Sequence, residues 1–123
     1  MSKWIEVAET TLKAIKTATK IPYEFERWNE EKRGKMPDTF IIYFLVSDTP
    51  LFSADGRERS SQPRIQVSLY YRDISVMKDI PEQIVAAFNA AGFRRSATGR
   101  IPYQQNTGHY GWRSDFTFYE KKG

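Results

Sequence analysis

The single histidine, His109, is the residue of this 123-residue chain whose type is best suited to acid–base chemistry. A general base needs a substrate or nucleophile within hydrogen-bond reach and a further group that orients the ring. The chain contains no cysteine, and His109 stands between Gly108 and Tyr110 in a segment that we expect to turn, with no carboxylate beside it. We therefore predict a structural or surface role for His109 and no catalytic residue.

Patterns that bind metals or phosphates are also missing from the sequence. Carboxylates occur singly or in scattered pairs such as Glu24/Glu26, without the alternating oxygen ligands of a calcium loop. The segment from Gly108 to Gly111 is too short for a phosphate-binding loop, and no helix is expected after it. Glu24 and Glu26 alternate on what we interpret as an edge strand, where charges discourage aggregation. We expect no metal, no cofactor and no enzymatic activity.

A basic cluster interleaved with aromatic residues is the remaining chemical signal. Arg94, Arg95 and Arg100 lie near Phe93 and Tyr103, an arrangement found in proteins that bind single-stranded nucleic acids. No motif typical of RNA-recognition domains accompanies the cluster, and the aromatic residues are explained equally well as core. The excess of 19 basic over 15 acidic side chains is moderate and mixed along the chain. A nucleic-acid-binding module therefore stays open as an alternative, and an acidic partner protein would use the same arginines.

The stretch from Arg64 to Asp73, RIQVSLYYRD, is the strand around which we expect the fold to be organised. Apolar and polar residues alternate along it, which is typical of a strand with one buried face. The buried set holds the helices, while Tyr70 and Arg72 point away from them; the predicted buried residues are Ile65, Val67, Leu69 and Tyr71.

The same periodicities predict the other elements, and with 40% hydrophobic residues the chain has enough material for one core. Charged residues from Asn29 to Pro37 predict an exposed loop, and Asp55-Gly56 predicts a turn at the tip of a hairpin arm over residues 48–63. The remaining predictions are a helix from Ser2 to Lys20, an edge strand Tyr23–Trp28, a central strand Asp38–Ser47, a helix Pro81–Ala91, and strands Phe93–Tyr103 and Tyr110–Glu120.

The element order is therefore αβββαββ, in one domain that spans residues 1–123. Short connections between successive strands favour a mainly antiparallel five-stranded sheet with two helices packed on one face, an α+β fold. We expect Tyr70, Tyr119 and Tyr43 on the other face, where exposed tyrosines favour self-association. No segment approaches 18 uncharged apolar residues, so no membrane contact is expected.

The layout resembles that of a known family. It combines PDTFIIY (Pro37–Tyr43), SADG (Ser53–Gly56), IQVSLYY (Ile65–Tyr71), AAGF (Ala90–Phe93) and HYGWRSDFTFY (His109–Tyr119). Over nearly the full chain this order of segments is similar to that of the tail completion or tail terminator proteins of long-tailed bacteriophages (siphophages) and prophage-derived elements.

The resemblance implies a structural virion protein that assembles with itself as a ring, commonly a hexamer, at the head-proximal end of the tail tube. Its implied partners are the tail-tube protein and the head connector or head-completion protein, and its implied location is the neck of the virion tail, after assembly in the host bacterial cytoplasm. Whether the ring contacts DNA that passes through it stays open, as does another neck or baseplate role. The residues that best fit such interfaces are Leu51, Phe52, Arg57 and Arg59 of the arm, and Tyr70, Arg72 and Tyr119 of the exposed sheet face.

Overall fold

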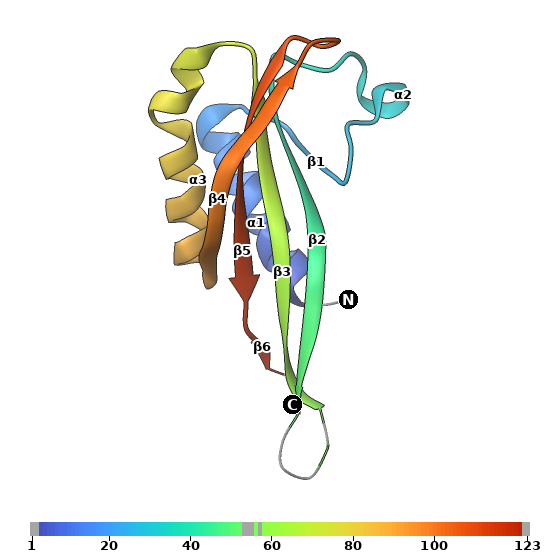
Figure 1. Cartoon of the computed structure of the whole chain (residues 1–123), viewed down its shortest axis with the longest axis vertical. Helices are drawn as coiled ribbons and strands as arrows, with labels where there is room; N and C mark the ends of the chain where they lie inside the picture. The colour runs from blue at the N-terminus through green and yellow to red at the C-terminus, as the bar shows by residue number, and fades with distance from the viewer. Residues whose placement is uncertain (1–2, 53–55, 57, 122–123) are drawn as a thin grey trace.

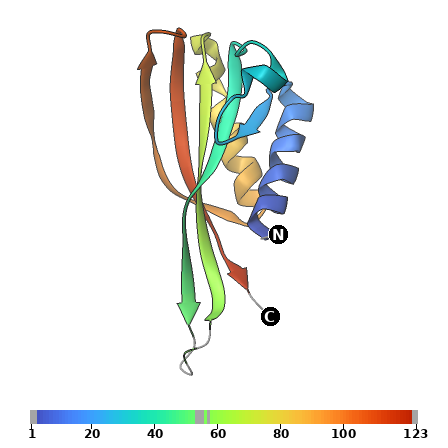
Figure 2. The same cartoon turned by 90° about the vertical axis from the view of Figure 1, so that its right-hand side faces the viewer.

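The computed structural model describes residues 3–52, 56 and 58–121 as a sheet with the two long helices on one side (Figures 1 and 2). Within these residues the sheet order is β1–β2–β3–β5–β4, and a short strand β6 pairs with β3. The predicted α+β fold and its element order are confirmed, with α2, η1 and β6 as short additions. The elements are α1 (Lys3–Thr19), β1 (Tyr23–Phe25), α2 (Glu30–Arg33), β2 (Thr39–Phe52), β3 (Glu58–Tyr71), η1 (Ile74–Lys78), α3 (Ile80–Ala90), β4 (Phe93–Gln104), β5 (His109–Phe118) and β6 (Glu120–Lys121).

Local chemistry explains where α1 ends and where α3 begins and ends. In α1, the residues at helical spacing Trp4, Ala8, Leu12 and Ile15 are buried against the sheet. The helix ends at Thr19, because Lys20 adopts a positive φ of 66° and Pro22 follows. The first turn of α3 contains Pro81, which lacks the N–H that would be unpaired there, and Gly92 follows the helix with φ 99°.

Strand β3 is the centre of the sheet, between β2 and β5. Its predicted alternation is confirmed, since Ile65, Val67 and Leu69 are fully buried and belong to the core beneath α1 and α3. On the neighbouring strand β5, Phe116 is also fully buried and stacks on Phe88 of α3 with ring centroids 4.9 Å apart. This aromatic contact fixes α3 on the sheet.

Strand β2 differs from the prediction in two respects. It is second from the edge rather than central, because β1 pairs in parallel along its outer side. Tyr43 is not on the exposed face: it is 1% exposed, and its phenol donates a hydrogen bond to the Glu9 carboxylate of α1. The reason is register, since Tyr43 pairs with the core residue Val67 and cross-strand partners share a face.

The predicted hairpin arm is the lower part of one long β2–β3 hairpin, which projects beyond the helices in Figure 2. Pairing continues from Thr39↔Tyr71 to Phe52↔Glu58, with a bulge between Leu45 and Ser47 and a second register shift between Leu51 and Phe52. Each strand has 14 residues, or about 46 Å at 3.3 Å per residue. In the turn, Gly56 has φ 80°, as expected for a turn glycine; Asp55 lies outside the described residues.

Candidate functional site

The face of the sheet opposite α1 and α3, called here the open face, carries the strongest candidate site. Phe40 and Ile42 of β2 point to this face but are only 3% and 7% exposed. The connection between β1 and β2 covers them, because it turns back over this end of the sheet before β2 begins. The charged segment Asn29–Pro37 was predicted as a loop; it contains the one-turn helix α2, capped by the Asn29 side chain.

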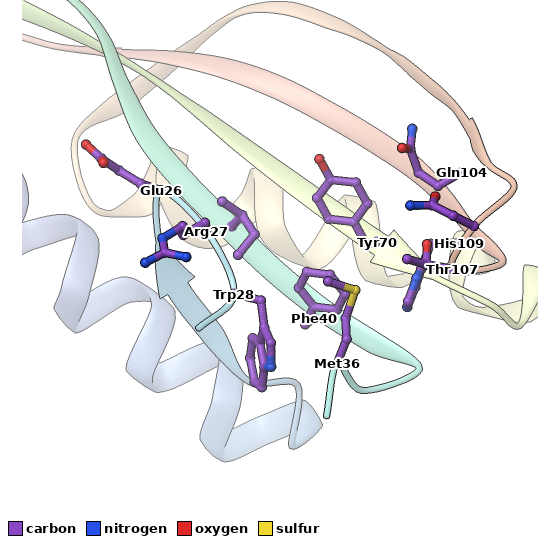
Figure 3. A pocket seen from close by; sticks show the side chains of 11 residues that line it. Glu26, Arg27, Trp28, Met36, Phe40, Tyr70, Gln104, Thr107 and His109 are labelled. Carbon is purple, nitrogen blue, oxygen red and sulfur yellow. The ribbon is translucent and has the colours of Figure 1, made fainter. Parts of the chain in front are cut away.

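A pocket of about 330 Å³ lies between this connection and the open face (Figure 3). Its walls come from the β1–β2 connection, from strands β2 and β3, and from the β4–β5 turn together with the strand residues that flank this turn. That volume is sufficient for one or two large side chains and small for most drug-sized ligands. The lining residues are Glu26, Arg27, Trp28, Met36, Phe40, Ile42, Tyr70, Gln104, Asn106, Thr107 and His109.

Aromatic rings form the floor and one wall of this pocket, and their positions are fixed. Phe40 stacks on Tyr70 with centroids 5.1 Å apart, and Trp28 lies tilted against Phe40 at 5.5 Å. The Trp28 indole N–H donates to the Gly34 carbonyl at 3.0 Å, and the Arg33 guanidinium lies over the same ring. Burial raises the pKa of the Tyr70 phenol, and a hydrogen bond donated by the Ser68 hydroxyl to the phenol oxygen partly offsets this rise. The pocket therefore presents a preformed aromatic surface, with the charged residues Glu26 and Arg27 also in its lining.

His109 packs against Phe40, one of the aromatic residues that line the pocket. It is 1% exposed, it begins strand β5 rather than standing in a turn, and its ring meets the edge of Phe40 at 5.2 Å. Its Nε2 lies 2.8 Å from the Pro37 carbonyl. Because a carbonyl can only accept, Nε2 must carry the proton and donate. His109 thus joins the start of β5 to the segment before β2, which is a structural role.

The other end of the open face is polar. Asp115 of β5 is 5% exposed and receives two hydrogen bonds from Arg64, at 3.0 Å from Nε and 2.7 Å from Nη2. Arg113 lies on its other side, with Nη1 3.5 Å from Oδ1. The buried carboxylate is therefore compensated by two guanidinium groups, as a charge in such a position requires.

The predicted interface residues separate into two groups. Tyr70 lines the pocket, and Arg72 adjoins it, donating to Asp38 at 2.6 Å and to the Thr107 carbonyl at 3.0 Å. Tyr119 is 58% exposed. It lies eight residues along the chain from Gly111, the residue that pairs with Tyr70, so Tyr119 is about 26 Å from the Tyr70 end of the sheet. The arm residues are near that far end: the structure describes only the backbone of Leu51, Phe52 and Arg59, and Arg57 lies outside the described residues.

Among the residues that line the pocket, only Tyr70 was predicted as an interface residue. The large apolar lining residues that the prediction missed are Trp28, Met36, Phe40 and Ile42. Trp28 and Met36 lie on either side of a highly charged segment. The charges of this segment alone predict an exposed loop. The signal for Trp28 and Met36 in the sequence was that large apolar residues flank both ends of the loop, so that it can be held against a hydrophobic surface.

The basic cluster is only partly arranged for stacking on bases. Arg94, Arg95 and Arg100 are exposed on β4. Phe93, however, is 3% exposed and packs on Phe118 in the core, so it cannot stack on a base. Tyr103 is 50% exposed, but its ring packs on Tyr110 with centroids 4.8 Å apart.

Among the described residues, no three His, Cys, Asp or Glu side chains are grouped so that they could hold a metal ion. No helix within the same residues is long and apolar enough to span a membrane. Comparison of the chain with protein-family models gave no match, and a search of curated proteins gave none either.

Proposed function

We propose that this chain is a structural protein of a bacteriophage or prophage tail, which assembles as a ring, commonly hexameric, on the head-proximal end of the tail tube. In this role it stops tube growth and docks onto the head connector or head-completion protein at the virion neck. Its working parts are interfaces, and it has no enzymatic activity. The proposal starts from the resemblance in segment order to tail terminator proteins.

The observation that carries the proposal is the aromatic pocket on the open face. Protein interfaces are enriched in aromatic side chains that anchor one partner in a preformed pocket of the other. Such anchor residues contribute most of the binding free energy and cluster near the centre of the interface. The pocket is concave and lined by Trp28, Phe40 and Tyr70, and its size suits side chains of a partner protein. On this proposal a large apolar side chain of the tail tube, the connector or a neighbouring copy enters it.

The proposal is tested by measuring the mass of the purified protein over a range of concentrations and by imaging it with and without its tail-tube protein. We expect closed rings in at least one condition. A monomer at high concentration that forms no rings with tail-tube protein would count against the proposal.

A matched pair of variants then tests the role of the open face. Tyr70→Asp places a charge in the pocket, whereas Leu69→Asp places one in the core, where Leu69 is fully buried. We expect Leu69→Asp to unfold the protein and Tyr70→Asp to leave it folded, with a lower melting temperature and weakened assembly. Equal loss of stability from both substitutions would refute the assignment of the two faces.

A nucleic-acid-binding module is the second candidate, favoured by the three exposed arginines of β4. It predicts that the protein shifts short DNA in a gel at physiological salt, with affinity that falls steeply as salt rises. Replacement of Arg94, Arg95 and Arg100 by Gln should then abolish the shift. Absence of any shift by the parent protein removes this candidate.

A further inference from the structure

The two edges of the sheet differ in charge. Strand β4 forms one edge, and within the described residues no strand pairs with its outer side. Its sequence FRRSATGRIPYQ contains three arginines and no acidic residue. The side chains of Arg94, Arg95 and Arg100 are exposed, and none of them forms an ion pair with a carboxylate of the described residues. An unpaired edge exposes a row of backbone N–H and C=O groups that can pair with another strand.

The opposite edge is incomplete. Strand β1 covers only Ile41–Tyr43 of β2, so in the described part of the chain the outer side of β2 has no neighbour from Phe44 onwards. This free stretch carries a single charge, that of Asp48, and no basic residue. It also exposes two apolar side chains that the fold does not bury, Leu45 at 39% and Val46 at 46%.

The two edges are suited to pair with each other, because their strands run in opposite directions and their charges lie on the same side of the sheet. Since β2/β3, β3/β5 and β5/β4 are all antiparallel, β4 runs opposite to β2. A second copy placed beside the first in the same orientation would therefore bring its β2 antiparallel to β4. Arg95 pairs with Phe116 and Asp48 pairs with Pro63, and both positions belong to the helix-covered side of the sheet. In a continuous sheet these opposite charges lie on the same face.

We infer that copies of this chain join head to tail through their sheets, with β4 of one copy pairing along Phe44–Pro50 of the next and Arg95 beside Asp48. The joint rests on the proposed ring and specifies how it is built. Charge also selects this pairing over others: two β4 edges repel each other through their arginines, whereas β4 and β2 attract. A contact between two different edges is heterologous, which is the kind that generates closed rings.

The alternative is that these charges only protect the edges. Lone charges and prolines commonly block edge pairing, and Pro50 and Pro102 lie at the ends of the two free stretches. If the charges only protected the edges, a charge of either sign would serve at either edge. It also leaves the exposure of Leu45 and Val46 beside Asp48 without a purpose, whereas a strand laid along β2 would cover both.

Charge reversal tests the joint without disturbing the fold, because Arg95 and Asp48 are exposed. We expect Arg95→Glu and Asp48→Arg each to weaken self-association about tenfold, measured by sedimentation or mass photometry, and the double variant to restore it. Arg100→Glu combined with Asp48→Arg is the matched control for position along β4. Melting curves of all variants check that folding is unchanged.

Cross-linking tests the geometry directly, because the natural chain has no cysteine. Thr49 and Ala97 both lie on the open-face side of their strands. With a short bismaleimide, the double variant Thr49→Cys/Ala97→Cys should give a ladder of covalent oligomers, while a mixture of the two single variants should stop at dimers. Thr10→Cys/Ala97→Cys, with one cysteine on the exposed side of α1, should give no ladder.

The outcomes separate this inference from the proposed function. Rings that neither cross-link at this pair nor respond to charge reversal would overturn the edge joint and leave the ring proposal intact. Dimers formed by Ala97→Cys alone would indicate β4–β4 pairing and would also overturn it. A chain that stays monomeric at every concentration and never cross-links overturns the joint, and imaging with tail-tube protein then decides the ring separately.

Discussion

Replacing Gly111 by alanine should destabilise the protein, although alanine is normally the better residue in a strand. Gly111 lies on β5 between Tyr70 of β3 and Ile101 of β4. A Cβ at this position would stand 2.5 Å from the Cβ of Ile101, which is attached directly to the backbone and cannot rotate away. The strands must therefore separate locally.

The size of the effect follows from two opposing terms. Overpacking of this kind costs about 1–3 kcal/mol. Removing a glycine from a strand returns about 0.5–1 kcal/mol. The net loss is about 1–2 kcal/mol, and since unfolding entropy scales with chain length, 1 kcal/mol corresponds to about 4 °C for a chain of this size. We expect the melting temperature of Gly111→Ala to fall by about 4–8 °C.

The assay is urea and thermal unfolding, followed by circular dichroism and tryptophan fluorescence. Gly99→Ala is the matched control, because its Cβ would meet only the flexible guanidinium of Arg113, at 3.2 Å. That variant should unfold at the same temperature or slightly above. In an Ile101→Gly background the clash is gone, so Gly111→Ala should become stabilising. A Gly111→Ala protein as stable as Gly99→Ala would refute the register of β4 against β5.

Two further predictions concern the core. Phe116→Ala removes a fully buried ring stacked on Phe88 and should lower the free energy of unfolding by about 3–5 kcal/mol, measured by urea titration; a shift in melting temperature of a degree or two would contradict its burial. Tyr43→Phe should cost about 1 kcal/mol at neutral pH through loss of the hydrogen bond to Glu9. Burial and the Glu9 carboxylate raise the pKa of Tyr43 above its ordinary value of 10.0, so its contribution is present below about pH 10 and is lost as the pH rises further. Tyr43→Phe should therefore lose less stability between pH 9 and 11 than the parent, and equal losses would refute this account.

For strands that have one polar face, the sequence predicted correctly which face is buried. In β3 the alternation of Ile65, Val67 and Leu69 with polar residues fixes which side is buried, because a shift by one residue would expose all three. The same reasoning failed for Tyr43, since Phe40, Ile41, Ile42 and Tyr43 are all buried and an unbroken apolar run does not distinguish its two faces. Only the pairing with Val67 assigns Tyr43 to the core.

The pocket could not be predicted from the sequence either, because local patterns do not show how the β1–β2 connection is placed. It depends on the route of the chain between β1 and β2, which passes through α2 and makes β1 parallel to β2 instead of antiparallel. Short connections favour antiparallel neighbours, and a charged segment favours solvent. The contacts of Trp28 with Phe40 and with the Gly34 carbonyl, which fold that segment over the open face, are visible only in three dimensions.

Strand β2 combines two roles that meet at its bulge. Before Leu45 it is buried on both faces, by α1 on one side and by the β1–β2 connection on the other. From Leu45 to Pro50 all its side chains are exposed, yet it continues in register with β3. A strand that only completed the core could end at the bulge. The extension exposes two apolar residues and a single acidic one, and in the joint proposed above it is the part of β2 that a second copy would cover.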